Sequence, residues 1–450
     1  MFRFLSLAAT AVLAIGQAAI AADDRHVVVI TLDGFPASYL DDPEVSIPVI
    51  RSLRDAGAST EEGLIVSNPS VTWPNHTTLM TGLHPATHGV IFNGLPQRHG
   101  AGQPATVERE KTQQELVHVP LLFDILKRKG LSSAAIQWPC AAGSESIDDN
   151  FPAIPYAAER YITPRLLAEL EKAGLWEKYK NGGAADKDAV RVEAALRIIK
   201  DRMPRLLALH LIELDSTHHQ HGPDTPQGRT VANRLDGLVG DILKALDEAG
   251  VRDKTALFVV SDHGFITTTK TLNPNVAFVN EGLIEVKDGK IAKARAHVIP
   301  EGGIGMIYLT DPATREEDRA TVRRLLEDAE GVAAVLDPAD FARLGLPTPD
   351  AHPGMADMVV AAKEGYAVGG SFTAKSVVTK KKSPGGTHGY LTTEPKMRAL
   401  FVASGAGIKP GSKLPEIENI HIAPTVAHLL GVTLDRADGR VLTELLDDAQ

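Results

Sequence analysis

The chain has 450 residues, of which 43% are hydrophobic and 23% are charged, and its formal net charge is −10 at pH 7. This composition excludes a disordered chain and allows either one large α/β domain or two smaller ones. Because the acidic balance leaves no basic surface excess, we expect no binding to nucleic-acid polymers or to anionic lipid.

The first segment of the chain is typical of a cleaved secretory signal. Arg3 precedes a short, alanine-rich apolar run that ends in Ala-Ile-Ala at 19 to 21. We expect residues 1–21 to be removed, which leaves a mature domain over 22–450 without a stable membrane anchor. Cys140 is the only cysteine, so no intramolecular disulfide can form. These features favour a periplasmic or secreted enzyme over a disulfide-rich ectodomain.

Four apolar runs rich in β-branched residues predict the strands of the core. They are "HVVVITLD" (26–33), "RLLALHLIELD" (205–215), "TALFVVSD" (255–262) and "RALFVASG" (398–405). Continuous apolar runs bounded by turn signals are typical of buried strands in a mainly parallel sheet. Helical patterns lie between them, such as the one that Pro204 ends. The alternation predicts an α/β fold with a doubly wound, mainly parallel sheet flanked by helices.

Two segments interrupt this alternation. The polar region at about 92–118 is rich in Gly, Gln and Glu, and we interpret it as an excursion over the edge of the sheet. The region at about 266–386 mixes strand-like pieces, a helix and a Pro-rich loop, so we expect an inserted cap subdomain there.

Three of the four strand runs end in an aspartate: Asp33, Asp215 and Asp262. A single aspartate at such a place is more often a helix cap. Because ligands of open α/β sheets gather beyond the carboxyl ends of the strands, three together predict one acidic site.

Histidines accompany these aspartates. His219 follows Asp215 by four residues, His263 follows Asp262 directly, and His388 lies in "SPGGTHGYL". Carboxylates and imidazoles without thiolates suit catalytic zinc, and six ligands suit two ions. Converging carboxylates need cations, and few lysines or arginines lie near them in the sequence. The same ligand set also accepts manganese or iron.

The stretch "SVTWPNHTTLMTG" offers a nucleophile. Thr72 precedes Trp73 and Pro74, so we expect it at the N-cap of a short helix. On spacing alone, a bare cap is one interpretation. The other is a hydroxyl that a metal ion activates beside helix amides that bind an anion.

Seven segments in this order resemble the alkaline phosphatase superfamily and, within it, the nucleotide pyrophosphatase/phosphodiesterase family. They are "VVVITLDGF", "SVTWPNHTTLMTGLHPATHGVIFN", "IQWPCAAG", "LIELDSTHHQHGP", "SDHGF", "GGTHGY" and "IHIAPTVAHLLGV".

The resemblance implies roles for individual residues. Thr72 would be the nucleophile of a phosphothreonine mechanism, and the Asn93 amide would hold a phosphoryl oxygen. One zinc ion would bind Asp215, His219 and His388. The other would bind Asp33, Asp262, His263 and the Thr72 oxygen.

The resemblance also implies a substrate class. At "QWPCAAG" this chain lacks the cations that monoesterase branches place against the phosphate, which favours a singly charged diester. Cys140 stands outside the C-x-P-x-R stretch of sulfatases. We therefore expect a secreted hydrolase of phosphodiester or pyrophosphate bonds in small, nucleotide-like substrates. The alternatives are a phosphomonoesterase, a phosphonate hydrolase of the phosphonoacetate type, and a non-catalytic metal-binding relative.

The other histidines considered are interpreted as structural or solvated, although His218 adjoins His219 and is the alternative ligand. The D-S-x-x-H spacing of the family favours His219. The set comprises His76, His84, His88, His118, His210, His218, His221 and His352.

Overall fold

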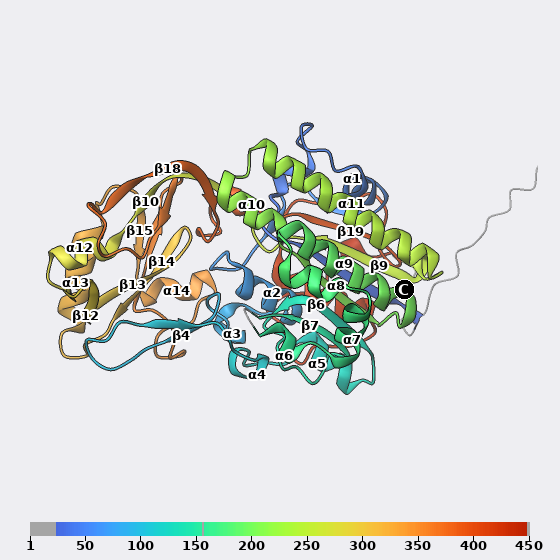
Figure 1. The fold of residues 1–450 in the computed structure, drawn as a ribbon, viewed down its shortest axis with the longest axis horizontal. Coiled ribbons are helices and arrows are strands. Elements are labelled where there is room, and N and C mark those ends of the chain that lie inside the picture. The colour runs from blue at the N-terminus through green and yellow to red at the C-terminus, as the bar shows by residue number, and fades with distance from the viewer. Residues whose placement is uncertain (1–23, 155–156, 448–450) are drawn as a thin grey trace, which may run out of the picture.

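The computed structural model describes residues 24–154 and 157–447, so the expected signal segment lies outside the described residues. The chain forms two lobes that lie side by side (Figure 1). The large lobe contains an eight-stranded sheet, and the small lobe contains sheets built from residues 266–387. Among the described residues, no helix combines the length and the hydropathy needed to cross a membrane.

The central sheet is mainly parallel. Its order is β20 (Ser412–Leu414), β2 (Ala58–Thr60), β19 (Phe401–Gly405), β9 (Thr255–Val260), β1 (His26–Leu32), β8 (Leu206–Leu211), β6 (Ser133–Pro139) and β7 (Asp149–Ala153). Strand β1 pairs in parallel with both β8 and β9, whereas β19 runs antiparallel to β9. The centre of the sheet therefore consists of the apolar runs expected to be buried strands.

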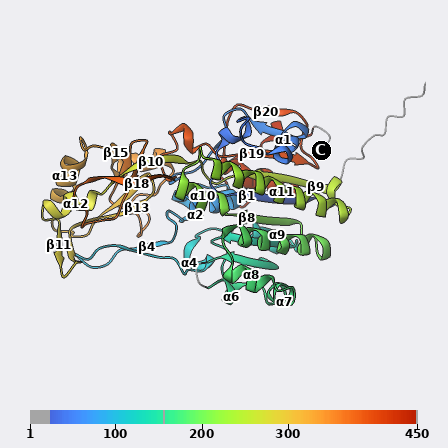
Figure 2. The ribbon, with the colours of Figure 1, turned by 45° about the horizontal axis from the view of Figure 1, so that its top comes forward.

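Helices cover both faces of the sheet, as Figure 2 shows. Along β1, Val28 and Ile30 face one layer and Val27 and Val29 face the other, because successive side chains of a strand alternate. The first layer contains α1 (Pro48–Ala56), α7 (Pro164–Lys172), α9 (Ala184–Asp201) and α11 (Pro226–Glu248). The second contains α2 (Thr72–Thr81), α5 (Leu122–Arg128) and α15 (Ile422–Leu429). This arrangement confirms the doubly wound fold.

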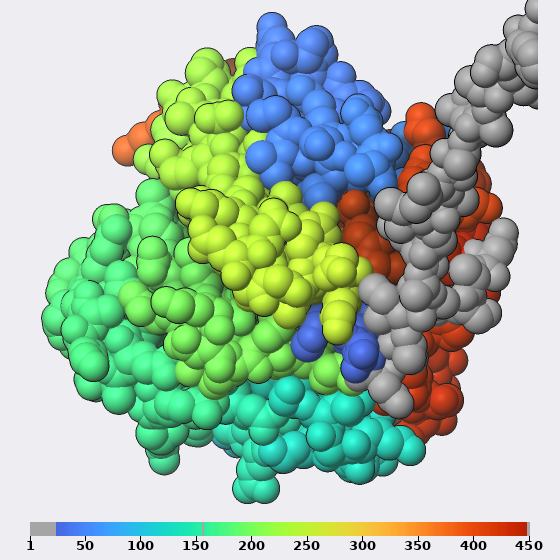
Figure 3. Space-filling view, turned by 90° about the vertical axis from the view of Figure 1, so that its right-hand side faces the viewer, coloured from blue at the N-terminus to red at the C-terminus, as the bar shows by residue number. Residues whose placement is uncertain are grey.

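Shorter helices connect these elements. They are α3 (Pro85–His88), α4 (Gln113–Leu116), α6 (Ala158–Tyr161), α8 (Leu175–Asn181) and α10 (Glu213–His221). Seen from one end, the large lobe brings early, middle and late segments of the chain side by side (Figure 3). Its core is therefore assembled from distant parts of the sequence.

The small lobe has a hydrophobic core of its own, which includes Phe278 and Ile307. Its three-stranded sheet has the order β17 (Tyr366–Val368), β10 (Ile266–Leu272) and β18 (Val378–Thr387). Its four-stranded sheet has the order β13 (Ala296–Glu301), β14 (Ile304–Leu309), β16 (Met358–Ala362) and β15 (Val332–Leu336). A further pair consists of β11 (Ile284–Lys287) and β12 (Lys290–Ala294). Its helices are α12 (Pro274–Asn280), α13 (Arg315–Leu326) and α14 (Pro338–Phe341).

The region at 92–118 differs from its expected place. Instead of crossing the edge of the central sheet, it forms the hairpin of β4 (Leu95–Gln97) and β5 (Thr106–Glu108), which extends along the small lobe (Figure 1). Phe92 packs with Tyr308, and the Gly102 carbonyl accepts a hydrogen bond of 2.8 Å from the Ala294 N–H. The hairpin thereby joins the two lobes.

Candidate active site

Six expected metal ligands converge at the carboxyl ends of the central strands. Asp33 follows β1 directly, Asp262 and His263 follow β9, and His388 follows β18. One expectation is wrong: the run at 205–215 is a strand only as far as Leu211. Asp215 and His219 instead lie one turn apart on α10, where residues four positions apart share a helix face.

The six side chains form two neighbouring groups. Within each group, one possible ligand atom per residue lies within 4.8 Å of the others. One group contains Asp33, Asp262 and His263, and the other contains Asp215, His219 and His388. The imidazole rings of His263 and His388 stack with their centroids 3.7 Å apart, which brings the groups together.

Several atoms in these groups have the environment that a cation requires. Asp33 Oδ1, Asp262 Oδ2, Asp215 Oδ1 and His263 Nε2 are buried and make no hydrogen bond within the described part of the chain. Burial, with repulsion by Asp262 and Asp215, holds the pKa of Asp33 well above its usual value. Burial also lowers the pKa of His263 to about 4, which leaves a neutral imidazole as a possible ligand. Two divalent cations would compensate these carboxylates, so the residues fit the implied metal ions.

A third group of possible ligands, His76, His210 and Asp262, has a different character. The ring nitrogens of His76 lie 2.9 Å from the Thr72 carbonyl oxygen and 2.9 Å from the Thr31 hydroxyl. Those of His210 lie 3.1 Å from the Gln137 carbonyl oxygen and 3.0 Å from Asp33 Oδ2. Because all four nitrogens already have partners, we interpret these histidines as supports for Thr72 and Asp33.

Thr72 lies at the start of α2, but it is not the expected N-cap. The N-cap is Val71, and Thr72 is the first helical residue. Neither its hydroxyl nor its backbone N–H takes part in a hydrogen bond among the described residues. The hydroxyl is therefore free to act as a nucleophile.

Asn93 lies beside the same helix end. Its Oδ1 accepts a hydrogen bond of 2.8 Å from the Trp73 N–H, and its own N–H donates to Glu301 Oε1 at 3.4 Å. Because Oδ1 is occupied, the Nδ2 hydrogens remain as donors, and within the described ranges they have no acceptor. Asn93 can thus present an amide donor next to that of Thr72.

A cleft of about 610 Å³ opens beside Thr72, Asp33 and Asp215. Two lysines that the sequence did not associate with the aspartates also line it. Lys180 forms an ion pair of 2.5 Å with Glu177, whereas the Lys187 ammonium lies 5.8 Å from the centre of the Tyr179 ring. Helices α8 and α9 supply them, so their proximity depends on the fold.

His218, the alternative ligand, points away from both groups. It is fully buried, its Nδ1 donates to the Gly34 carbonyl at 3.2 Å, and its Nε2 lies 3.0 Å from the Tyr39 hydroxyl oxygen. Its neighbour His219 instead has Nε2 3.3 Å from Asp215 Oδ1.

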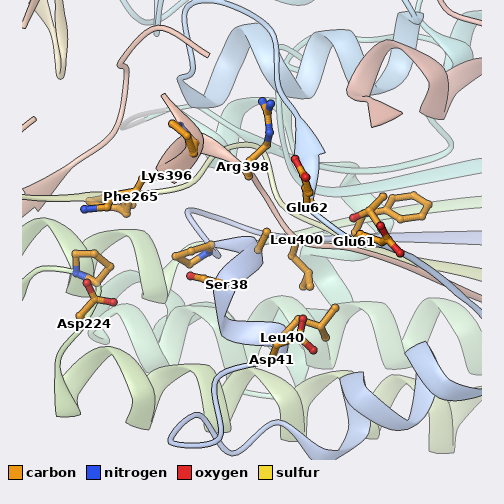
Figure 4. A pocket seen from close by; sticks show the side chains of 17 residues that line it. Ser38, Leu40, Asp41, Glu61, Glu62, Asp224, Phe265, Lys396, Arg398 and Leu400 are labelled. Carbon is orange, nitrogen blue, oxygen red and sulfur yellow. The ribbon is translucent and has the colours of Figure 1, made fainter. Parts of the chain in front are cut away.

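A second cavity, of about 340 Å³, is shown in Figure 4. Carboxylates and cations line it too, but they are paired or exposed: Asp41 lies 3.0 Å from Arg54, and Arg398 lies 3.2 Å from Glu416. Neither Thr72 nor any of the six candidate ligands lines this cavity.

The chain is similar to known proteins over most of its length. The family model described as type I phosphodiesterase / nucleotide pyrophosphatase matches residues 27–391. The human ectonucleotide pyrophosphatase/phosphodiesterase family member 1 is 26% identical over 419 residues, which are 90% of this chain and 40% of that protein. An uncharacterized pyrophosphatase/phosphodiesterase of Schizosaccharomyces pombe is 26% identical over 92% of this chain and 78% of its own length.

Solved structures share the fold. The structure of murine ectonucleotide pyrophosphatase/phosphodiesterase 5 has a TM-score of 0.70 at 20% identity and covers 94% of this chain and 100% of its own. An inactive form of that murine protein was solved in complex with AMP, with a TM-score of 0.69. The match to the family model over most of the chain shows that it belongs to the type I phosphodiesterase / nucleotide pyrophosphatase family.

Proposed function

We propose that this protein hydrolyses phosphodiester or pyrophosphate bonds of small, nucleotide-like substrates, with Thr72 as nucleophile and two bound zinc ions. The observation that carries the proposal is the free Thr72 hydroxyl, which shares one cleft with the carboxylates of Asp33 and Asp215. The complex of a structural neighbour with AMP supports a nucleotide as the substrate.

Each group of ligands would hold one ion. Asp33, Asp262 and His263 would bind one together with the Thr72 oxygen, and Asp215, His219 and His388 would bind the other. When bound, zinc lowers the pKa of a hydroxyl or water ligand and neutralises negative charge on the phosphate.

The protein's own residues account for the geometry of attack. Thr72 Oγ1 forms a bond to phosphorus as the bond to the leaving oxygen breaks, and water then cleaves the phosphothreonine. Each displacement inverts phosphorus, so we expect overall retention of configuration. The Asn93 Nδ2 and the Thr72 N–H donate to a phosphoryl oxygen whose charge grows in the transition state.

A second candidate function rests on Lys187. A dianionic phosphomonoester or a phosphonate needs more cationic compensation than a diester, and this lysine lines the cleft without an acidic partner among the described residues. Its ammonium nevertheless lies 5.8 Å from the centre of the Tyr179 ring, whose π electrons already interact with the positive charge. We therefore favour the diester.

A substrate comparison tests the proposal. Zinc-loaded protein should hydrolyse bis-p-nitrophenyl phosphate with a higher kcat/KM than p-nitrophenyl phosphate, and a chelator should abolish both activities. A strong preference for the monoester would support the second candidate. Two bound zinc ions without turnover of any phosphate ester would indicate a non-catalytic relative.

A further inference from the structure

Gln137 has an unusual backbone conformation at the wall of the cleft. It lies in β6 with φ of 57°, in the left-handed region that costs free energy for a residue other than glycine. The pairing of β6 with β7 shifts register between Ile136 and Pro139, so the strand is irregular at this residue. Such irregularities redirect side chains near functional sites.

Two contacts hold Gln137 in this position. Its carbonyl oxygen accepts a hydrogen bond of 3.1 Å from His210 Nδ1, and the other ring nitrogen of His210 lies 3.0 Å from Asp33 Oδ2. Its side-chain Oε1 accepts a hydrogen bond of 2.9 Å from the Tyr179 hydroxyl. The backbone of Gln137 is thus linked through His210 to the candidate metal ligand Asp33, and its carboxamide is hydrogen-bonded to Tyr179.

These contacts leave one group without a partner. The residue is 8% exposed, it lines the same cleft as Thr72 and Asp33, and no hydrogen bond within 24–154 and 157–447 uses its Nε2. Because its oxygen already accepts from Tyr179, the Nε2 hydrogens remain available as donors to a molecule bound in the cleft.

We propose that Gln137 is a specificity-determining residue whose Nε2 donates a hydrogen bond to an oxygen of the bound phosphate ester. This inference rests on the proposed function. The donor is neutral, like the Asn93 amide, so the two carboxamides stabilise a singly charged phosphodiester without adding the positive charge that a dianionic monoester requires.

Four substitutions in the zinc-loaded full-length chain test this role. Gln137→Met keeps the length of the side chain but removes the donor, and it should lower kcat/KM for bis-p-nitrophenyl phosphate at least about tenfold. Gln137→Lys should raise the ratio of p-nitrophenyl phosphate to bis-p-nitrophenyl phosphate activity. Tyr179→Phe, which frees the carboxamide, should cause a smaller loss than Gln137→Met. Cys140→Ala is the matched control, since Cys140 has φ of 56° but does not line the cleft.

The outcomes separate the two proposals. A diester loss in Gln137→Met with an unchanged melting temperature supports the role, and a raised ratio in Gln137→Lys places the side chain at position 137 close to the phosphate. An unchanged KM and kcat in Gln137→Met overturn the inference alone. A wild type that hydrolyses neither ester overturns the proposed function and the inference with it.

The p-nitrophenyl ester of a nucleoside 5′-monophosphate shows which oxygen of the substrate accepts the hydrogen bond from Gln137 Nε2. If Nε2 contacts a phosphoryl oxygen, Gln137→Met loses activity equally on this ester and on the bis-aryl ester. If it contacts an oxygen of the organic group, the loss is larger on the nucleoside ester. An absence of loss on both esters contradicts the inference.

Discussion

The cleft at Thr72 and the cavity of Figure 4 have similar charged linings but differ in how those charges are partnered. Around the cleft at Thr72, the buried atoms Asp33 Oδ1 and Asp215 Oδ1 make no hydrogen bond within the described residues. In the cavity of Figure 4, Asp41 and Arg398 form ion pairs, and Glu62 is exposed. Residue types alone therefore do not distinguish the two cavities, whereas the partners of their charged groups do.

Among substitutions in the cleft, removal of the Thr72 hydroxyl should lower the activity most strongly. We expect Thr72→Ala to lower kcat for bis-p-nitrophenyl phosphate by about 10⁴-fold or more, because alanine cannot form the covalent intermediate. Thr77→Val is the matched control, since Thr77 lies on the same helix with its hydroxyl bonded to the Trp73 carbonyl. Initial rates under saturating substrate measure both, and a Thr72→Ala enzyme as active as the control would rule out this nucleophile.

The amide beside Thr72 should have the next largest effect. Asn93→Ala should lower kcat by about 10²-fold with a smaller change in KM, because its donor acts mainly on charge that develops in the transition state. Steady-state kinetics measure the two constants. Asn233→Ala, at an exposed site on α11, should leave them unchanged. A change confined to KM would place Asn93 in ground-state binding only.

Substitution of a candidate metal ligand should have opposite effects on two quantities: it should weaken metal binding and stabilise the metal-free protein. Asp33→Asn should lower bound zinc from two equivalents to about one. It should also stabilise the metal-free protein by about 1 kcal/mol, because it removes one of the repelling buried carboxylates. Elemental analysis and thermal unfolding in chelator measure these quantities. Glu62→Gln, in the other cavity, should alter neither, and destabilisation of metal-free Asp33→Asn would contradict the repulsion.

The smallest effect concerns Glu301, a 7% exposed residue of the small lobe that accepts from the Asn93 N–H. Burial holds its pKa well above the usual value, despite the opposing Asn93 N–H and Arg109. The folded state therefore retains a proton that the unfolded state releases, so stability falls as pH rises above about 4.5.

Glu301→Gln should consequently be more stable than the wild type at pH 8, by about 1 kcal/mol or less, and the difference should shrink towards pH 4.5. Thermal unfolding of metal-loaded protein across this range measures the difference. Equal pH profiles for variant and wild type would mean that Glu301 is ionised in the folded protein.

Much of the large lobe follows from local sequence. The apolar runs at 26–33 and 255–262 predict β1 and β9 because parallel strands covered on both faces must be apolar throughout. The run at 205–215 misleads beyond Leu211, since Ile212 is the N-cap of α10 and Leu214 is buried as a residue of that helix. Short apolar runs do not separate the two conformations.

Other features depend on contacts between distant segments. The position of Asp215 on a helix, the lysines of the cleft and the bond between His210 and Asp33 all depend on how layers pack and on strand register. The hairpin at 95–108 lies against the small lobe, and its polar composition does not specify that partner. The place of Gln137 in the cleft depends on its backbone angle and on its bond to Tyr179, neither of which the local sequence specifies.

The central claim is that the Thr72 oxygen attacks phosphorus, and a covalent adduct tests it directly. Zinc-loaded protein mixed with bis-p-nitrophenyl phosphate and quenched in acid within one turnover should carry the mass of the substrate minus p-nitrophenol. Peptide mapping should locate that mass on Thr72 and find none in Thr72→Ala. An adduct on another residue, or burst kinetics with unmodified Thr72, would contradict the assignment.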